Sequence, residues 1–187
     1  MKFIFDFDDV LFYNTRQFKP HMFSYLQKIG IAPDTAREYY AKVRVREFSL
    51  KNFISTLAIR EKIDKNPEDA YKEIMSQCRK FVNTELINLI KKSGKENCFL
   101  ITNGEKEYQG DKIIETGIDF LFSQIIIVPG SKKEAVEKLC SQYKNEKVIF
   151  IDDKVKYFED LDFKKYPNLK TILYDENSLE HLKAEIK

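Results

Sequence analysis

Cysteine is scarce in this sequence, and an excess of charge of either sign is absent. The three cysteines, Cys78, Cys98 and Cys140, are widely spaced and form no CxxC pair. This pattern excludes a disulfide framework and a zinc site built on paired thiols, and it favours a reducing compartment. The 32 Lys and Arg residues nearly balance the 30 Asp and Glu residues, and the net charge is +2 at pH 7. Such mixed charge provides neither a basic field for nucleic acid nor a polybasic membrane anchor.

Long apolar runs and flexible linkers are missing as well. No stretch approaches the roughly 20 apolar residues of a membrane-spanning helix. Asp6, Asp8 and Asp9 interrupt the N-terminal apolar segment, which makes that segment unsuited to secretion. There is no internal repeat, low-complexity tract or Gly/Ser linker. We therefore expect a soluble, cytoplasmic protein whose 187 residues form one domain, or one core domain with a modest insertion.

Short apolar segments alternate with stretches of helical periodicity. Five segments rich in Ile, Val and Phe read as buried strands, at residues 2–8, 97–102, 124–128, 147–152 and 170–174. Helical patterns lie between them, at residues 84–92, 105–116 and 131–143. This alternation predicts an α/β fold with a doubly wound, Rossmann-like, parallel five-stranded sheet.

The first two predicted strands are too far apart for a simple crossover. Three further helical patterns lie between them, at residues 34–47, 50–63 and 68–82. We predict an all-helical cap at residues 15–83, inserted into a core made of residues 1–14 and 84–187. The cap carries six basic or aromatic side chains that could meet an anionic or planar substrate, although a solvated helix face is the favoured interpretation: Arg37, Tyr39, Tyr40, Lys42, Arg44 and Arg46. The isolated His21 and His181 are interpreted as surface or packing residues.

Reactive side chains gather where the predicted strands end. The first strand carries two aspartates, the second ends in a threonine, the fourth ends in two aspartates, and a lysine begins the helix after the third: Asp6, Asp8, Thr102, Asp152, Asp153 and Lys132. Parallel strands place these ends at one edge of the sheet, where open α/β sheets bind ligands. Asp6 and Asp8 can face the same side of a strand. Each feature alone is common in structural roles, but their convergence at one edge indicates a functional site.

Carboxylates at such density need a counter-charge. Each pair costs about 4 kcal/mol at ~4 Å and an effective dielectric of ~20. Hard oxygen ligands suit Mg²⁺, which would also accept an oxygen of a phosphate. Lys132 would offset further charge, and the Thr102 hydroxyl could donate to a phosphoryl oxygen. Of Asp6 and Asp8, one could attack while the other transfers protons.

Four segments of this sequence resemble motifs of the haloacid dehalogenase superfamily. They read FIFDFDDVLF, LITNG, GSKKEAVEKL and VIFIDDK, in the family's order, and the resemblance covers the chain outside the helical insert. The insert falls where that family places a helical cap. Two positions depart from the pattern, since Asp9 stands where glycine is frequent and Asn14 where an acidic residue is frequent. We expect both departures to bear on substrate choice.

The resemblance implies a role for each matching residue. Asp6 would be the nucleophile, and Asp8 the acid/base that also offers its main-chain carbonyl to the metal. Thr102 and Asn103 would bind phosphate, together with the lysine of the third motif.

That lysine is Lys132 or Lys133, and the family's spacing favours Lys132. Asp152 and Asp153 would hold the metal together with Asp6.

These roles predict a Mg²⁺-dependent phosphatase that hydrolyses a small phosphorylated metabolite through an aspartyl-phosphate. A phosphomutase or phosphotransferase on the same scaffold would share every motif. A dehalogenase is disfavoured, because that chemistry needs no acid at Asp8. A phospho-receiver domain or an inactive binding module belongs to another class and fits less well. The sequence does not indicate the substrate's identity or the oligomeric state.

Overall fold

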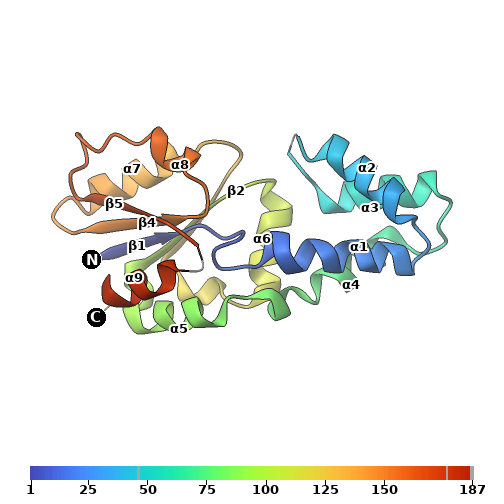
Figure 1. Cartoon of the computed structure of the whole chain (residues 1–187), viewed down its shortest axis with the longest axis horizontal. Helices are drawn as coiled ribbons and strands as arrows, with labels where there is room; N and C mark the ends of the chain where they lie inside the picture. Colours follow the sequence, from blue (N-terminus) through green and yellow to red (C-terminus); the bar gives the residue numbers. More distant parts are fainter. Residues whose placement is uncertain (46, 176, 186–187) are drawn as a thin grey trace.

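A five-stranded parallel sheet forms one end of the molecule, and a group of helices forms the other (Figure 1). The computed structural model describes residues 1–45, 47–175 and 177–185, so Arg46 and the side chain of His181 lie outside it. The strands are β1 (Lys2–Phe5), β2 (Cys98–Asn103), β3 (Gln124–Val128), β4 (Val148–Asp152) and β5 (Leu169–Leu173). Their order in the sheet is β3-β2-β1-β4-β5. The predicted fold class is confirmed.

Helices cover both faces of the sheet, because alternate residues of each strand bury opposite sides. Phe3 and Phe5 pack with residues of α5 (Thr84–Ser93), α6 (Lys106–Thr116) and α9 (Ser178–Glu185). Ile4, between them, packs on the other face with residues of α7 (Lys133–Gln142) and α8 (Lys156–Glu159). Two short 3-10 helices, Lys95–Asn97 and Asp119–Leu121, precede β2 and β3. No helix within the described ranges is long and apolar enough to cross a membrane.

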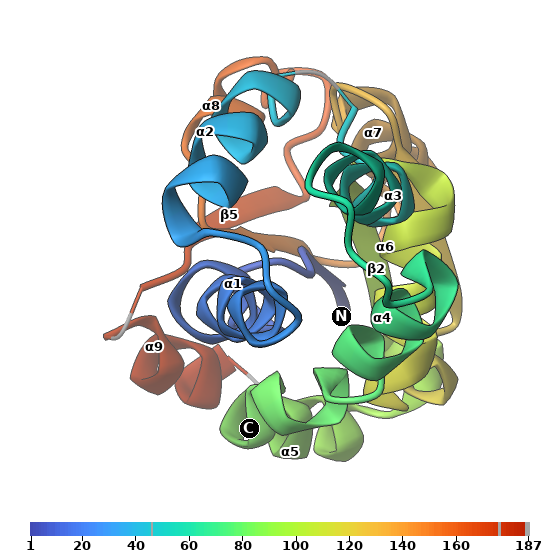
Figure 2. The same cartoon turned by 90° about the vertical axis from the view of Figure 1, so that its right-hand side faces the viewer.

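The segment between β1 and α5 is helical, as predicted. A π-helical turn (Asn14–Phe18) leads into α1 (Lys19–Lys28), which is followed by α2 (Pro33–Val43), α3 (Leu50–Arg60), α4 (Pro67–Met75) and a 3-10 turn (Cys78–Phe81). Figure 2 views the molecule from this end, with α1 to α4 in front. The sequence prediction missed α1, whose Lys-Pro start resembles a break, although proline fits the first turn of a helix.

The helical insert and the sheet share one hydrophobic cluster. Phe18, Met22 and Leu57 of the insert belong to the same cluster as Phe5 and Leu86 of the core. A second contact is polar, since the Tyr71 hydroxyl donates to Asp111 Oδ2 on α6 at 2.6 Å. The predicted boundary of the cap at residues 15 and 83 therefore stays a prediction, because packing runs continuously across it.

The first strand is shorter than the predicted 2–8 segment. It ends at Phe5, and the Asp6 N–H still donates to the Ile151 carbonyl at 2.9 Å. The Phe7 carbonyl then accepts from the N–H groups of Leu11 and Phe12, at 2.9 and 3.0 Å. This turn takes Asp8 out of the strand, so the two-residue alternation of a strand does not determine where Asp8 points.

Candidate functional site

The reactive residues meet at the carboxyl edge of the sheet. Because β1 lies between β2 and β4, the residues that end or follow these three strands are neighbours in space. Asp6 follows β1, Thr102 lies near the end of β2, Asp152 ends β4 and Asp153 follows it. Thr102 is buried beside these ends, with 1% of its surface exposed. The strand order thus brings together side chains that are far apart in sequence.

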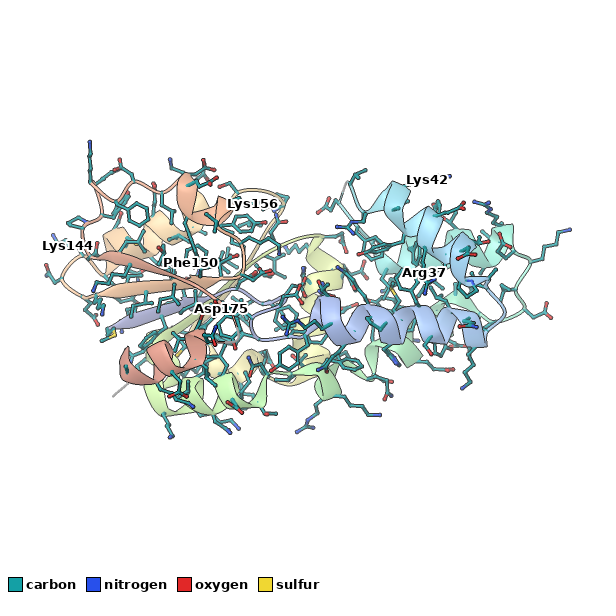
Figure 3. The ribbon with its side chains drawn as sticks, in the orientation of Figure 1. Arg37, Lys42, Lys144, Phe150, Lys156 and Asp175 are labelled. Atoms are coloured by element: carbon teal, nitrogen blue, oxygen red, sulfur yellow. The ribbon has the colours of Figure 1, made fainter. Side chains whose placement is uncertain are left out.

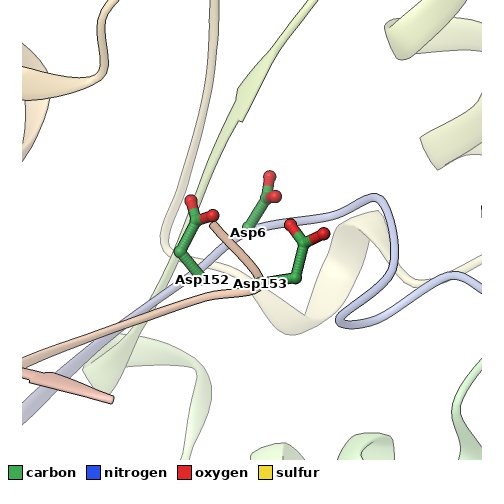
Figure 4. Close-up of side chains that lie close together, drawn as sticks. All are labelled: Asp6, Asp152 and Asp153. Carbon is green, nitrogen blue, oxygen red and sulfur yellow. The ribbon is translucent and has the colours of Figure 1, made fainter. Parts of the chain in front are cut away.

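Three carboxylates form a cluster in which a metal ion could bind. Asp6, Asp152 and Asp153 each offer one oxygen, and these oxygens all lie within 4.8 Å of one another. Figure 4 shows the three carboxylates turned toward the same space. Burial, and next the charge of Asp6, raise the pKa of Asp152 to about 6. The set fits Mg²⁺, which prefers carboxylate oxygens, and a dication would relieve the repulsion within the cluster.

Lys132 lies among these carboxylates. Its Nζ is 2.7 Å from Asp6 Oδ1 and 2.6 Å from Asp152 Oδ2, and 1% of its side chain is exposed. Burial lowers the pKa of Lys132, but Asp6 and Asp152 more than offset that effect, and the net pKa is raised. The lysine therefore stays charged and neutralises one of the three negative charges, which leaves two for a divalent cation.

Lys133 lies outside the site. Its side chain is 43% exposed, and its Nζ is 3.9 Å from Glu137 on the same helix. Of the two lysines that the sequence left open, Lys132 reaches the carboxylates, because the chain enters α7 immediately after it.

Two donors hold the same oxygen of Asp6. Oδ1 accepts from the Phe7 N–H at 2.7 Å and contacts Lys132 Nζ. Among the described residues, no hydrogen bond is made to Oδ2. A carboxylate held through one oxygen keeps the other available for attack on an electrophile.

Asp8 is held apart from the cluster by a second buried lysine. Lys112 Nζ lies 2.6 Å from Asp8 Oδ1 and 2.8 Å from Oδ2, and the Gln109 amide donates to Oδ2 at 2.9 Å. Lys112 is completely buried, and its Nζ lies 4.7 to 5.5 Å from the ring centres of Phe7, Phe12 and Tyr108. The sequence interpretation missed both α6 residues. Their three-residue spacing, which places them on one helix face, was the available signal.

The loop after β2 orders its neighbours. The Asn103 side-chain amide donates to the carbonyls of Val128 and Gly130 at 3.2 and 2.7 Å, so it fixes the loop that leads to Lys132. These bonds engage the side-chain N–H groups of Asn103, and the predicted phosphate binding by this residue stays a prediction. Gly104 has φ +149°, and a Cβ there would lie 2.7 Å from Gln109 Nε2. Glycine therefore allows Gln109 to approach Asp8.

The two positions that depart from the motif pattern have distinct local structures. Asp9 has φ +62°, in the left-handed region that glycine adopts most easily. Its carboxylate accepts from the N–H and hydroxyl of Thr15, at 2.7 and 2.6 Å. The Asn14 Oδ1 atom is buried and has no partner in the described part of the chain.

Two cavities meet at Asp8. One, of about 550 Å³, lies between insert and core and is lined by residues that include Tyr40, Phe48 and Tyr108. The other, of about 860 Å³, reaches one member of the carboxylate cluster, Asp153, and is also lined by Lys154. Four residues line both cavities: Asp8, Asn14, Lys19 and Arg44. The substrate of any reaction at Asp6 and Asp8 would have space on either side of Asp8.

The six cap side chains considered above behave differently. Arg37 and Lys42 are exposed on α2 (Figure 3), which agrees with a solvated face. Tyr39 is partly buried and stacks on Phe53, with ring centres 5.7 Å apart. Tyr40 and Arg44 line the smaller cavity, because α2 ends at Val43 and the chain turns there. The solvated-face interpretation is therefore wrong for the partly buried Tyr40, whereas Arg44 is exposed to solvent as well as lining the cavity.

Comparison with protein-family models and with the curated proteins gives no match to this chain. Solved structures do match. A haloacid dehalogenase-like hydrolase from Burkholderia xenovorans gives a TM-score of 0.70 at 16% identity, over 96% of this chain and 84% of that one. A magnesium-bound HAD-hydrolase from Bacillus subtilis gives 0.58 at 14% identity, over 100% of this chain and 98% of that one. A β-phosphoglucomutase from Thermotoga maritima gives 0.56 at 16% identity, over 97% and 91%.

Proposed function

We propose that this chain, whose fold is that of the haloacid dehalogenase-like hydrolases, is a Mg²⁺-dependent phosphatase. Its substrate would be a phosphate monoester of a small metabolite, and its intermediate an aspartyl-phosphate on Asp6. The magnesium complexes among the similar structures support the choice of metal.

One observation carries the proposal, namely that Asp6 and Asp8 are held in separate environments. Asp6 lies with Asp152, Asp153 and Lys132, where negative charge is partly neutralised and a dication fits. Asp8 lies between the two cavities and is held by Lys112. A nucleophile beside a cation site and a separate proton donor facing the leaving group are the requirements of phosphate ester hydrolysis through a covalent intermediate.

The first step follows from these positions. An oxygen of Asp6 attacks phosphorus, and the bond from phosphorus to the leaving oxygen breaks while Asp8 gives that oxygen a proton. Lys132 holds Asp6 in place and offsets negative charge on the transferring group, to which the Thr102 hydroxyl donates a hydrogen bond. When bound by Asp6, Asp152, Asp153 and the main-chain carbonyl of Asp8, Mg²⁺ would supply further charge stabilisation.

The second step reverses the role of Asp8. As a carboxylate it takes a proton from water, and the water oxygen attacks the acyl phosphate. Inorganic phosphate leaves, and the Asp6 carboxylate is restored. The insert, which lines one side of the smaller cavity, would exclude bulk water during both steps.

A phosphomutase or phosphotransferase is the second candidate, favoured by the similarity to a β-phosphoglucomutase. It would share the first step and differ only in the acceptor of the phosphoryl group. A dehalogenase is not favoured, because it would leave the Lys112-held acid at Asp8 without a role.

The test is a screen of the purified protein with Mg²⁺ against sugar phosphates, nucleotides and phospho-amino acids. For a phosphatase, one inorganic phosphate appears for each ester consumed, and Asp6→Asn abolishes it. Ester consumption without free phosphate, dependent on a second sugar, would identify a transferase. No turnover of any ester would reject both candidates.

A further inference from the structure

Two cations of the insert lie beside one aromatic ring above Asp8. Lys19 Nζ is 6.0 Å from the centre of the Tyr40 ring, and Arg44 Cζ is 5.6 Å from it. Lys19 and Arg44 line both cavities together with Asp8, and Tyr40 lines the smaller one. Lys19 and Arg44 therefore share both cavities with Asp8, the residue that is proposed to protonate the leaving group.

Neither cation is paired with a carboxylate within the described ranges. The hydrogen bond of Lys19 is to Thr15 Oγ1, at 3.4 Å. Burial lowers the pKa of Lys19, Arg44 lowers it further, and Asp9 and Asp8 act in the opposite direction. The positive charge of Lys19 is thus held at a cost that an anionic ligand would offset.

Three of the carboxylates nearby are already engaged. Asp8 is bound by Lys112, Asp9 by Thr15, and both carboxylate oxygens of Glu105 accept from N–H groups at the start of α6. Glu47 also lines the smaller cavity, on the exposed loop between α2 and α3. Within the described ranges, the smaller cavity thus offers Lys19 and Arg44 from the insert, and the exposed Lys156 from α8, as cations without a carboxylate partner.

A third feature points to a ligand independently of charge. The buried Oδ1 of Asn14, which has no partner among the described residues, belongs to a residue that lines both cavities. Leaving a buried acceptor without a hydrogen bond is unfavourable. A hydroxyl group on a bound molecule would supply the missing donor.

We propose that Lys19 and Arg44 bind a second anionic group, a carboxylate or a phosphate, on the leaving group of the substrate. Asn14 accepts a hydrogen bond from a hydroxyl next to that group, and Tyr40 packs against its carbon chain. The substrate class is accordingly a small hydroxylated phosphate monoester with a second negative charge. This inference rests on the proposed phosphatase function.

Matched substrates test it. Glycerol 3-phosphate and 3-phosphoglycerate differ by a carboxylate, and fructose 1-phosphate and fructose 1,6-bisphosphate differ by a phosphate. The wild type should have a higher kcat/KM for the charged member of at least one pair, and the pair that discriminates identifies the anion. Lys19→Met and Arg44→Gln should each reduce that ratio by about tenfold or more, as expected for loss of a charge-assisted hydrogen bond.

Arg37→Gln is the matched control. It removes a positive charge from α2, the helix that Arg44 follows, but the Arg37 side chain is 67% exposed and lines neither cavity. It should leave the ratio as in the wild type.

Three results would overturn the inference. The wild type could hydrolyse both members of each pair equally well. Lys19→Met and Arg44→Gln could slow charged and uncharged esters by the same factor, in which case the cations serve the transferring phosphoryl group. If the wild type hydrolysed no ester at all, the phosphatase function would fail first and this inference with it.

Discussion

The ammonium group of Lys112 lies 2.6 and 2.8 Å from the two carboxylate oxygens of Asp8. Asp6 has a separate buried lysine, Lys132, at 2.7 Å. Each aspartate of the first motif is therefore held by its own cation, one from α6 and one from the start of α7. Breaking a buried pair leaves an uncompensated charge, so each lysine stabilises the position of its own carboxylate.

Lys112→Met tests whether this pairing positions Asp8. Without the ammonium, Asp8 loses its fixed orientation, and kcat should fall roughly 10- to 100-fold with a smaller change in KM. The loss should be greatest for esters with poor leaving groups, because these depend most on proton donation. Steady-state kinetics on a series of aryl and alkyl phosphates measures both effects.

The control for this prediction is Lys106→Met, which removes a lysine from the exposed start of the same helix. The double variant Asp8→Asn/Lys112→Met should be no slower than Asp8→Asn alone, since Lys112 acts through Asp8. A double variant slower by the full factor of Lys112→Met would show that Lys112 acts independently.

Asp6→Asn and Asp8→Asn separate nucleophile from acid/base. Asp6→Asn removes the attacking anion, so turnover should fall by roughly three or more powers of ten and no phosphoenzyme should form. Asp8→Asn slows proton transfer in both steps, by about 10²- to 10⁴-fold. With an activated aryl phosphate, Asp8→Asn should accumulate a phosphoprotein that mass spectrometry detects and hydroxylamine cleaves. A label on His21 or on a serine would refute the mechanism.

The carboxylate cluster predicts dependence on a divalent cation. Activity should disappear in excess chelator and return with Mg²⁺, whereas Ca²⁺ should bind but support little turnover because its coordination is looser. Asp153→Asn should raise the Mg²⁺ concentration needed for half-maximal activity at least about tenfold. Asp64→Asn, at an exposed position in the insert, is the control. Full activity in chelator would contradict the assignment of the cluster.

His21 predicts a pH dependence of stability. Burial, and next the charge of Lys80, lower the pKa of His21, and its Nε2 is buried without a partner among the described residues. The unfolded chain therefore binds more protons than the folded protein just below pH 6.5, and stability is lost as the pH falls through that value. The wild type should lose more Tm between pH 7.5 and 5.5 than His21→Phe. Equal losses would show that His21 does not titrate on unfolding.

The sequence predicted the parts of the site that depend on strands. Asp6, Thr102 and Asp152 follow apolar runs that could only be buried strands, and parallel strands bring their ends together. Lys112 was not predictable in the same way. It meets Asp8 only through the packing of α6, and a lysine in a helix is ordinarily exposed. The phosphate-binding role of Asn103 stays a prediction, and the structure adds a contact that the motif does not indicate, because the side-chain amide of Asn103 donates to the neighbouring loop.

The starts of the helices also differ in whether the sequence predicts them. Helices α5 and α6 begin within one residue of the prediction, because Asn83 and Glu105 accept hydrogen bonds from the first-turn N–H groups. The start of α1 is a π-helical turn without a side-chain cap, and no residue type marks it. Capping side chains are visible in sequence, whereas a helix start that tertiary packing stabilises is not.

The position of β1 has a consequence for how the chain folds. Phe3 pairs with Cys98 on one side and with Ile149 on the other, so the first strand to be synthesised is the central strand of the sheet. Forming these long-range pairings requires long loops to close. Closing them costs conformational entropy and slows folding. On the ribosome, the N-terminal strand must wait for β4 before the sheet closes around it. The insert helices also pack on one another, as α3 and α4 do, and these local contacts can form during that delay.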